Sequence, residues 1–232
     1  MNLRKIYRQL SQKYGPQDWW PLLDIKMLRY RDISARGGPA LGRKISRKKI
    51  KVFSEKNMFE VCLGAILTQN TNWKNVEKAI LNLKRKKILS PRKILNTPPG
   101  KLRGLIRSSG YYNEKTKKLM TYSLWLMDNY KGSLKKFFKQ SLKKCREELL
   151  AVHGIGPETA DSILLYAGRK PSFVIDAYTR RLCKKYGVEF KTYDEYKEYF
   201  EKRLPKSYKL YNEFHALIVQ WGKNNSSIRK VD

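Results

Sequence analysis

The sequence has 232 residues, and its 51 Lys and Arg against 20 Asp and Glu give a formal net charge of +31. Such a charge predicts a polyanionic partner, nucleic acid above all, with a lysine-rich composition bias as the alternative. Three isolated cysteines and two histidines argue against a disulfide framework and against a zinc site. No 18-residue apolar run or signal-peptide pattern occurs, so we expect a soluble intracellular protein.

Apolar residues recur at helical spacing through most of the chain, as they do at Phe59, Leu63 and Ile66. Prolines and glycines divide these stretches into short segments. The only stretch that could form a strand, "PSFVID" at 171–176, is short enough to be a connector. We therefore predict an all-α fold of about ten short helices.

Two stretches near the N-terminus differ from this pattern. "DWWPLLD" places Trp19 and Trp20 before a proline, where tryptophans either anchor the core or offer faces for stacking. Residues 31–51, "RDISARGGPALGRKISRKKIK", are rich in glycine and positive charge and predict a flexible basic insert. This insert is either disordered or an arm that follows phosphates.

Further candidates follow predicted helical segments. In "LGAILTQNTNWKNVEKAILNLK", Gln69, Asn70 and Trp73 come after an apolar helix, where helix-end capping would also explain the polar pair. In "RSSGYYNEKTKKL", a Gly-aromatic turn leads into a lysine-rich helix, and we expect Lys115 and Lys117 to contact phosphates.

A tight turn lies in "VHGIGPETAD" at 152–161. Its glycines permit positive φ and close backbone approach, and Pro157 suits the first turn of a helix. The N–H groups of Gly154 and Gly156 would form an electropositive cup for a phosphate oxygen. An ordinary corner between two helices is the alternative.

Asp176 follows this turn in "LLAVHGIGPETADSILLYAGRKPSFVIDAYTRRL", where a helix N-cap is its default role. The stretch resembles the helix–hairpin–helix and Gly/Pro…Asp signature of the endonuclease III (HhH-GPD) superfamily of DNA glycosylases, over about 35 residues. The resemblance implies that the turn holds a DNA phosphate and that Asp176 is catalytic. It also implies a monovalent cation, Na⁺ or K⁺, on the backbone carbonyls of Leu150, Val152 and Ile155.

A fixed carboxylate suits this chemistry, because cleavage of an N-glycosidic bond generates an oxocarbenium-like sugar whose positive charge it stabilises. Members of the superfamily that also nick the strand carry a lysine nucleophile where this chain has Glu158. Glutamate cannot form an imine, so we expect hydrolysis by water. Glu158 is either a surface helix residue or orders the water or the sugar.

The C-terminal part departs from the superfamily in a further way. Many members end with a four-cysteine iron–sulfur loop, whereas no cysteine follows Cys183 here, so we expect no cluster.

The pattern "WWP" followed by "LGAILTQNTNW" is similar to the 3-methyladenine DNA glycosylase III group. That group has a buried lysine where this chain has Leu217 in "FHALIV", which leaves the base preference open. There, two aromatic side chains sandwich a flipped alkylpurine, and the matching positions are Trp20 and Trp73. Electron-rich indole faces favour a positively charged alkylated adenine. By the same resemblance, Gln69 and Asn70 fill the gap left by the flipped base or contact the opposite strand.

We accordingly expect a monofunctional DNA glycosylase for alkylated purines of the 3-methyladenine type, with no required cofactor. One alternative is a glycosylase for uracil, thymine or an oxidised base, with weak abasic-site lyase activity supported by a lysine such as Lys170. The other is a non-catalytic hairpin module that binds DNA, against which Asp176 argues, because phosphate binding needs the turn and not that carboxylate.

The expected architecture is two helical lobes with a DNA cleft between them. Residues 52–172 would form the central lobe, which contains the hairpin, and residues 1–51 with 173–232 the other. Double-stranded DNA with a damaged base is the expected partner, and a membrane is not. We expect a monomer of prokaryotic type in the cytoplasm, associated with the nucleoid.

Overall fold

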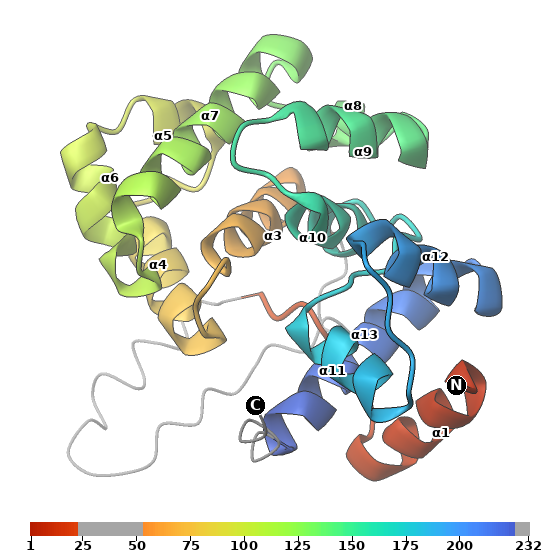
Figure 1. Ribbon diagram of the computed structural model, residues 1–232. Coiled ribbons are helices and arrows are strands. Elements are labelled where there is room, and N and C mark those ends of the chain that lie inside the picture. The colour runs from red at the N-terminus through yellow and green to blue at the C-terminus, as the bar shows by residue number, and fades with distance from the viewer. Residues whose placement is uncertain (23–52, 226–232) are drawn as a thin grey trace, which may run out of the picture. The chain divides into compact units, whose positions relative to one another are not determined.

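The computed structural model describes residues 1–22 and 53–225, so the predicted basic insert at 31–51 lies outside the described residues. The described chain is helical and has no β-strand (Figure 1), as the periodicity predicts. It divides into two compact units, a central unit with residues 20–22 and 53–155 and a terminal unit with residues 1–19 and 156–225.

The unit boundary at Ile155–Gly156 differs from the lobe boundary expected after residue 172. The second helix of the hairpin, α10 (Pro157–Ser162), continues into η3 (Ile163–Ala167), and η3 packs on α13 (Tyr208–Asn224). Because these contacts bury the apolar residues after the turn against C-terminal helices, the whole stretch belongs to the terminal unit.

The helices of the central unit follow the apolar periodicity and begin at polar caps. Ser54, Asn72 and Ser141 each accept a hydrogen bond from the backbone N–H three residues later. In chain order the elements are α3 (Glu55–Leu67), α4 (Trp73–Arg85), α5 (Pro91–Leu95), α6 (Pro99–Ile106), the 3₁₀ helix η2 (Arg107–Ser109), α7 (Tyr112–Tyr130), α8 (Leu134–Phe137) and α9 (Leu142–Ala151).

Helix α3 forms the core of the central unit, because every residue from Phe59 to Leu67 is buried. A helix that is buried on all sides must be enclosed by its neighbours, and α4, α7 and α8 all pack on α3. The first polar side chain after α3 is that of Thr68, whose Oγ1 donates to Gly64 O at 2.6 Å.

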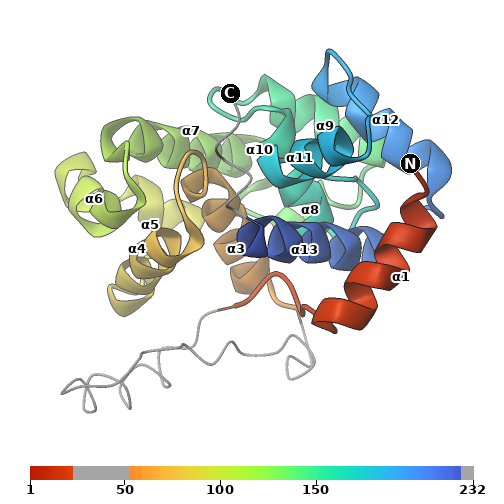
Figure 2. The ribbon, with the colours of Figure 1, turned by 60° about the horizontal axis from the view of Figure 1, so that its bottom comes forward.

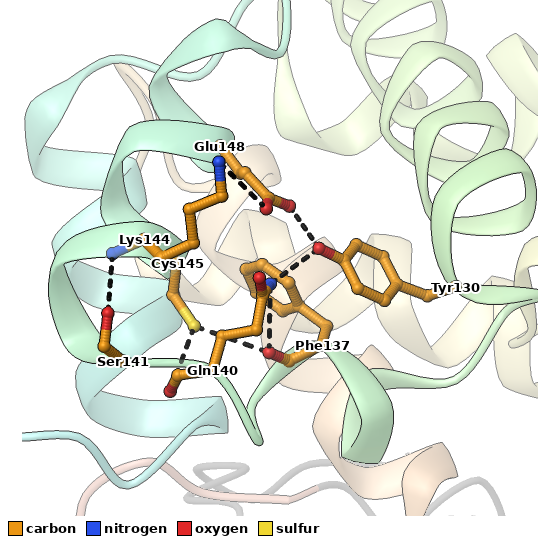
Figure 3. A network of polar contacts seen from close by, with 7 residues as sticks. All are labelled: Tyr130, Phe137, Gln140, Ser141, Lys144, Cys145 and Glu148. Atoms are coloured by element: carbon orange, nitrogen blue, oxygen red, sulfur yellow. Dashed lines mark hydrogen bonds and ion pairs between the residues drawn. The ribbon is translucent and has the colours of Figure 1, made fainter.

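A polar network joins α7 to α9, the helix that leads into the hairpin turn (Figure 3). The Tyr130 hydroxyl donates to a Glu148 carboxylate oxygen and accepts from Gln140 Nε2 at 2.6 Å. Nearby, the Cys145 thiol donates to Phe137 O at 3.4 Å. Burial and the Glu148 carboxylate raise the pKa of Tyr130 to about 12, so the hydroxyl stays a donor at neutral pH.

The terminal unit is built around α13, on which α1 and α11 pack (Figure 2). Gly222 permits this packing, because a Cβ there would lie 2.1 Å from the Tyr178 ring on α11. The elements of this unit are α1 (Leu3–Tyr14), α10, η3, α11 (Ala177–Lys185), α12 (Tyr193–Arg203) and α13.

Element η3 is a π-helical turn in which Gly168 N donates to Ile163 O, five residues back, at 3.0 Å. The chain then runs without regular structure to Asp176, so "PSFVID" is a connector. In the part of the chain that the structure describes, no helix is long and apolar enough to span a membrane.

Candidate active site

Asp176 joins the connector to α11 and caps that helix. Its Oδ1 accepts from Thr179 N at 2.7 Å and from Thr179 Oγ1 at 3.0 Å. Its Oδ2 lies 3.5 Å from His215 Nε2, and the side chain is 14% exposed. The capping role and the catalytic role are therefore compatible, because the cap uses one carboxylate oxygen and leaves the other for chemistry.

The surroundings of Asp176 keep it ionised. Burial alone would raise the pKa of this carboxyl, but the His215 imidazole and the two Thr179 donors outweigh it and hold the pKa below its ordinary value. A preorganised negative charge in a largely dehydrated position is the feature that stabilises an oxocarbenium-like sugar.

Glu158, in the first turn of α10, belongs to the same unit as Asp176, and the charge of Asp176 acts on it. The residue as a whole is exposed, but partial burial of its carboxyl and the negative charge of Asp176 raise its pKa to about 7, against the opposing effects of His215 and Arg180. Glu158 can therefore gain or lose a proton near neutral pH. A solvated surface glutamate, by contrast, would stay ionised at neutral pH.

A buried ion-pair network holds the connector before Asp176, and its members were absent from the sequence-based candidates. Ser172 Oγ donates to Asp161 Oδ1 at 2.6 Å, and Lys197 Nζ lies 3.3 Å from the same oxygen. Glu201 accepts from Lys197 Nζ and from Phe173 N at 2.6 and 2.8 Å. A signal was present, since Asp161 is a charged residue next to the apolar run "ILLYA".

The hairpin turn contains two glycines with different constraints. Gly154 has φ of +86°, and a Cβ there would lie 2.5 Å from Lys118 Cγ. Gly156 has φ of −88° and open space around its Cβ position. Only Gly154 therefore needs the conformational freedom that the sequence suggested for both.

The carbonyls of Leu150, Val152 and Ile155 remain candidates for a monovalent cation. Val152 O accepts from Ile155 N at 3.0 Å, which leaves a second lone pair for a cation. This backbone ligand set consists of oxygen atoms, which hard cations prefer.

Gln69 is tied to the hairpin turn within the central unit. Its Nε2 donates to Gly154 O at 3.1 Å, and its Oε1 accepts from Lys118 Nζ. Asn70, by contrast, is exposed and has a left-handed φ of 52°. The two residues that the resemblance assigned to the gap left by the flipped base, or to the opposite strand, are thus arranged differently, with Asn70 accessible and Gln69 bound to the turn.

Lys115 and Lys117 lie on α7 but have opposite environments. Lys117 is exposed beside Glu114 at 3.0 Å, so it can reach a phosphate. Lys115 is 2% exposed, and its Nζ donates to Leu67 O and Ser109 O at 2.8 and 2.6 Å. Burial and the charge of Lys118 lower its pKa to about 8. The predicted phosphate contact of Lys115 is therefore wrong, because its amine satisfies two buried carbonyls.

The aromatic pair is present in the central unit but is closed. Trp20 and Trp73 meet edge to face, with ring centroids 4.9 Å apart and planes at 88°. Trp20 is 4% exposed and lies on Gly64, where a Cβ would be 2.7 Å from its ring. Trp73 Nε1 donates to Glu77 Oε1 at 2.6 Å. A base sandwiched between parallel rings needs them about 7 Å apart, so it cannot enter this arrangement without movement of one indole.

Comparisons with known proteins show the family of the chain. Residues 63–206 match the model of the HhH-GPD superfamily base excision DNA repair protein. A protein of Methanocaldococcus jannaschii with the provisional name DNA repair glycosylase is 44% identical over 93% of this chain and 84% of its own. Endonuclease III of Thermotoga maritima is 29% identical over 79% of this chain and 81% of its own.

Among solved structures, the H. pylori 3-methyladenine DNA glycosylase (MagIII) bound to 1,N6-ethenoadenine superposes with a TM-score of 0.74 at 29% identity. The match covers 97% of this chain and 99% of that chain. The chain therefore belongs to the HhH-GPD superfamily of base excision DNA repair proteins and is a DNA glycosylase, whose partner is DNA with a damaged base.

The cysteines do not fit the iron–sulfur cluster that many endonuclease III relatives carry. A cluster of this kind is held by four cysteine thiolates, whereas the sequence has three cysteines. Cys62, Cys145 and Cys183 are each buried and free of disulfides. Among the residues that the structure describes, no group of His, Cys, Asp and Glu could hold a metal ion.

Proposed function

We propose that the protein is a monofunctional DNA glycosylase that hydrolyses the N-glycosidic bond of a flipped alkylated purine. The arrangement around Asp176 carries this proposal. One carboxylate oxygen is fixed by Thr179, the other is available, and the group stays ionised. Such a carboxylate stabilises the sugar as its bond to the base breaks.

In the proposed reaction the C1′–N bond breaks and its electron pair leaves with the base. The positive charge that develops on the sugar faces the ionised Asp176. Water then forms the new C1′–O bond and loses a proton, which Glu158 can accept because its pKa of about 7 lets it act as a base at neutral pH. The products are a free base and an abasic site.

Glu158 also supports the monofunctional assignment. Strand nicking by β-elimination starts from an imine between an enzyme amine and C1′. A carboxylate at the hairpin position cannot form this bond, so the reaction should stop at the abasic site. Borohydride should therefore trap no covalent adduct with DNA.

Two observations support an alkylated purine as the base. The H. pylori relative with 29% identity was solved with 1,N6-ethenoadenine, which is a modified adenine. Trp20 and Trp73 also provide indole faces, which attract a cationic base. Since the rings are closed on each other, we propose that the base either displaces one indole or stacks on Trp73, which is the more exposed of the two.

A different base is the second candidate, and Leu217 favours it. This residue is completely buried in α13, at the position where the 3-methyladenine DNA glycosylase III group has a lysine. An apolar side chain cannot replace the charge of that lysine, so uracil, thymine or an oxidised base stays a candidate.

For DNA binding we propose that the turn at Gly154 and Gly156 contacts a backbone phosphate and that Lys117 contacts a second one. The exposed Asn70 is the better candidate for the gap left by the base. Gln69 would instead keep the loop after α3 fixed to the turn through Gly154 O.

The test is a release assay on duplexes that each contain one modified base: 1,N6-ethenoadenine, 3-methyladenine, uracil, 8-oxoguanine or a T·G mismatch. We expect alkylpurine release that is detected as strand cleavage only after alkali. Asp176→Asn should lower the single-turnover rate by about 10²–10³-fold with unchanged DNA affinity. The exposed Asp128→Asn is the matched control.

Three results would count against the proposal. Full activity of Asp176→Asn would remove the catalytic assignment. Efficient nicking without alkali would contradict the monofunctional assignment. Equal alkylpurine release by Trp73→Ala and wild type would show that this indole does not bind the base.

A further inference from the structure

His215 lies between two polar side chains from other elements of the terminal unit. Its Nδ1 forms a hydrogen bond with the Tyr166 hydroxyl of η3, and its Nε2 faces Oδ2 of Asp176 at 3.5 Å. Tyr166 is 1% exposed and His215 is 5% exposed. Within the described residues, Nε2 is buried without a hydrogen-bond partner. The three side chains form a buried series that ends at the candidate catalytic carboxylate.

The two neighbours of His215, Tyr166 and Asp176, determine which ring nitrogen carries the proton. Because Nε2 faces a carboxylate oxygen, we assign the proton of a neutral imidazole to Nε2, so that Nδ1 accepts from the Tyr166 hydroxyl. That proton then points at the carboxylate oxygen that the Thr179 cap does not use. At 3.5 Å the contact is longer than a hydrogen bond, so it stabilises the charge and leaves Oδ2 free to face a reacting group.

We propose that His215, held by Tyr166, is a positioning residue that fixes the orientation of Oδ2 of Asp176 and stabilises its negative charge during glycosidic bond cleavage. The inference rests on the proposed function of Asp176. It assigns no bond-making step to His215, whose effect passes through the carboxylate.

Other groups also act on Asp176 and enter the test. Thr179 of α11 favours ionisation of Asp176 through its two donors, and the negative charge of Asp176 in turn raises the pKa of Glu158 on α10. Arg180 of α11 acts on Glu158. Loss of His215 alone should therefore raise the pKa of Asp176 without neutralising the group at pH 7.

The first experiment does not need activity. The side-chain carboxyl ¹³C resonance of Asp176 is titrated in the full chain for wild type, His215→Leu and His215→Gln. We expect the pKa of Asp176 to rise by about one unit or more in His215→Leu. In His215→Gln, whose amide can still donate toward Oδ2, the rise should be smaller. Equal pKa values in wild type and a folded His215→Leu would overturn the inference.

If His215→Leu does not fold, the decision rests on Tyr166→Phe, which keeps the ring and removes the hydroxyl that holds Nδ1. A rise of the Asp176 pKa in Tyr166→Phe supports the inference. Unchanged pKa values in both Tyr166→Phe and His215→Gln overturn it.

The second experiment measures single-turnover base release against pH on the duplex that wild type cleaves best. In His215→Leu the lower acid limb, which Asp176 sets and which is distinct from the limb that Glu158 sets near pH 7, should move to higher pH by the same shift as the titration. The rate at pH 7 should be at least tenfold lower, with unchanged DNA affinity. A lower rate with an unmoved acid limb would indicate a merely structural role and overturn the inference. If wild type releases no base, the proposed function fails, and the titration still decides on His215.

Discussion

At the residue scale, the two glycines of the hairpin turn differ in backbone conformation. Gly154→Ala combines a left-handed φ of +86° with a clash against Lys118, whereas Gly156→Ala meets open space. We expect Gly154→Ala to lower the free energy of unfolding by about 1–3 kcal/mol and to weaken DNA binding. Gly156→Ala should cost less than about 1 kcal/mol.

Chemical denaturation and a DNA titration on both variants check this. Equal losses of stability would mean that the turn tolerates a side chain at Gly154. The close packing of Lys118 on Gly154 would then have no structural importance.

Individual residues also differ in how well their environment can be predicted from the sequence. The position of Asp176 could be predicted, because a carboxylate between an apolar run and a helix is a recognisable cap. The burial of Lys115 could not, because a lysine among other lysines is normally solvated and nothing local reveals the carbonyls of Leu67 and Ser109. Contacts between residues 48 apart in sequence, such as that of Lys115 with Leu67, depend on the tertiary fold.

At the scale of elements, α12 holds the connector to α10 through a buried ion pair. Lys197→Met would remove one positive charge from beside the buried Asp161, which keeps Ser172 as a partner, so we expect a loss of about 3 kcal/mol. Adding Asp161→Asn should restore part of the stability, because a neutral amide needs the charge of Lys197 less than a carboxylate does.

Lys202→Met is the matched control on the same helix. Its ion pair with Glu198 is exposed on both sides, so its loss should cost less than about 1 kcal/mol. Thermal or chemical unfolding of Lys197→Met, Asp161→Asn, the variant that combines them and Lys202→Met gives the comparison. Strictly additive effects of Lys197→Met and Asp161→Asn would contradict a coupled pair.

The elements themselves were largely predictable, since periodic apolar residues and Pro or Gly breakers mark helices such as α4 and α7. The π-helical turn η3 was not. All five of its residues are buried, so "ILLYA" carries no periodicity that would distinguish a π-turn from an α-turn.

At the scale of the whole molecule, the net charge of +31 predicts DNA binding that weakens steeply with salt. Lys117→Ala and Lys115→Met remove the same formal charge, but only Lys117 is exposed for a phosphate contact. We expect the slope of log Kobs against log salt to fall by about 0.9 for Lys117→Ala and to stay unchanged for Lys115→Met.

Fluorescence anisotropy over a series of salt concentrations measures both slopes. A reduced slope for Lys115→Met would mean that this lysine leaves its buried site when DNA binds. The long-range field is altered equally in the two variants, so any difference between them reports direct contact.

The π-turn of η3 makes the direction of Tyr166 depend on a residue count. Such a turn holds one residue more than an α-turn, so the residues after it are out of phase with a continuous α-helix by about 100°. A deletion of one of residues 163–165 would therefore turn the tyrosine away from His215, even if the apolar composition were preserved. When distant members of the superfamily are aligned, a gap at this place would thus be a sign that the tyrosine and the histidine have separated.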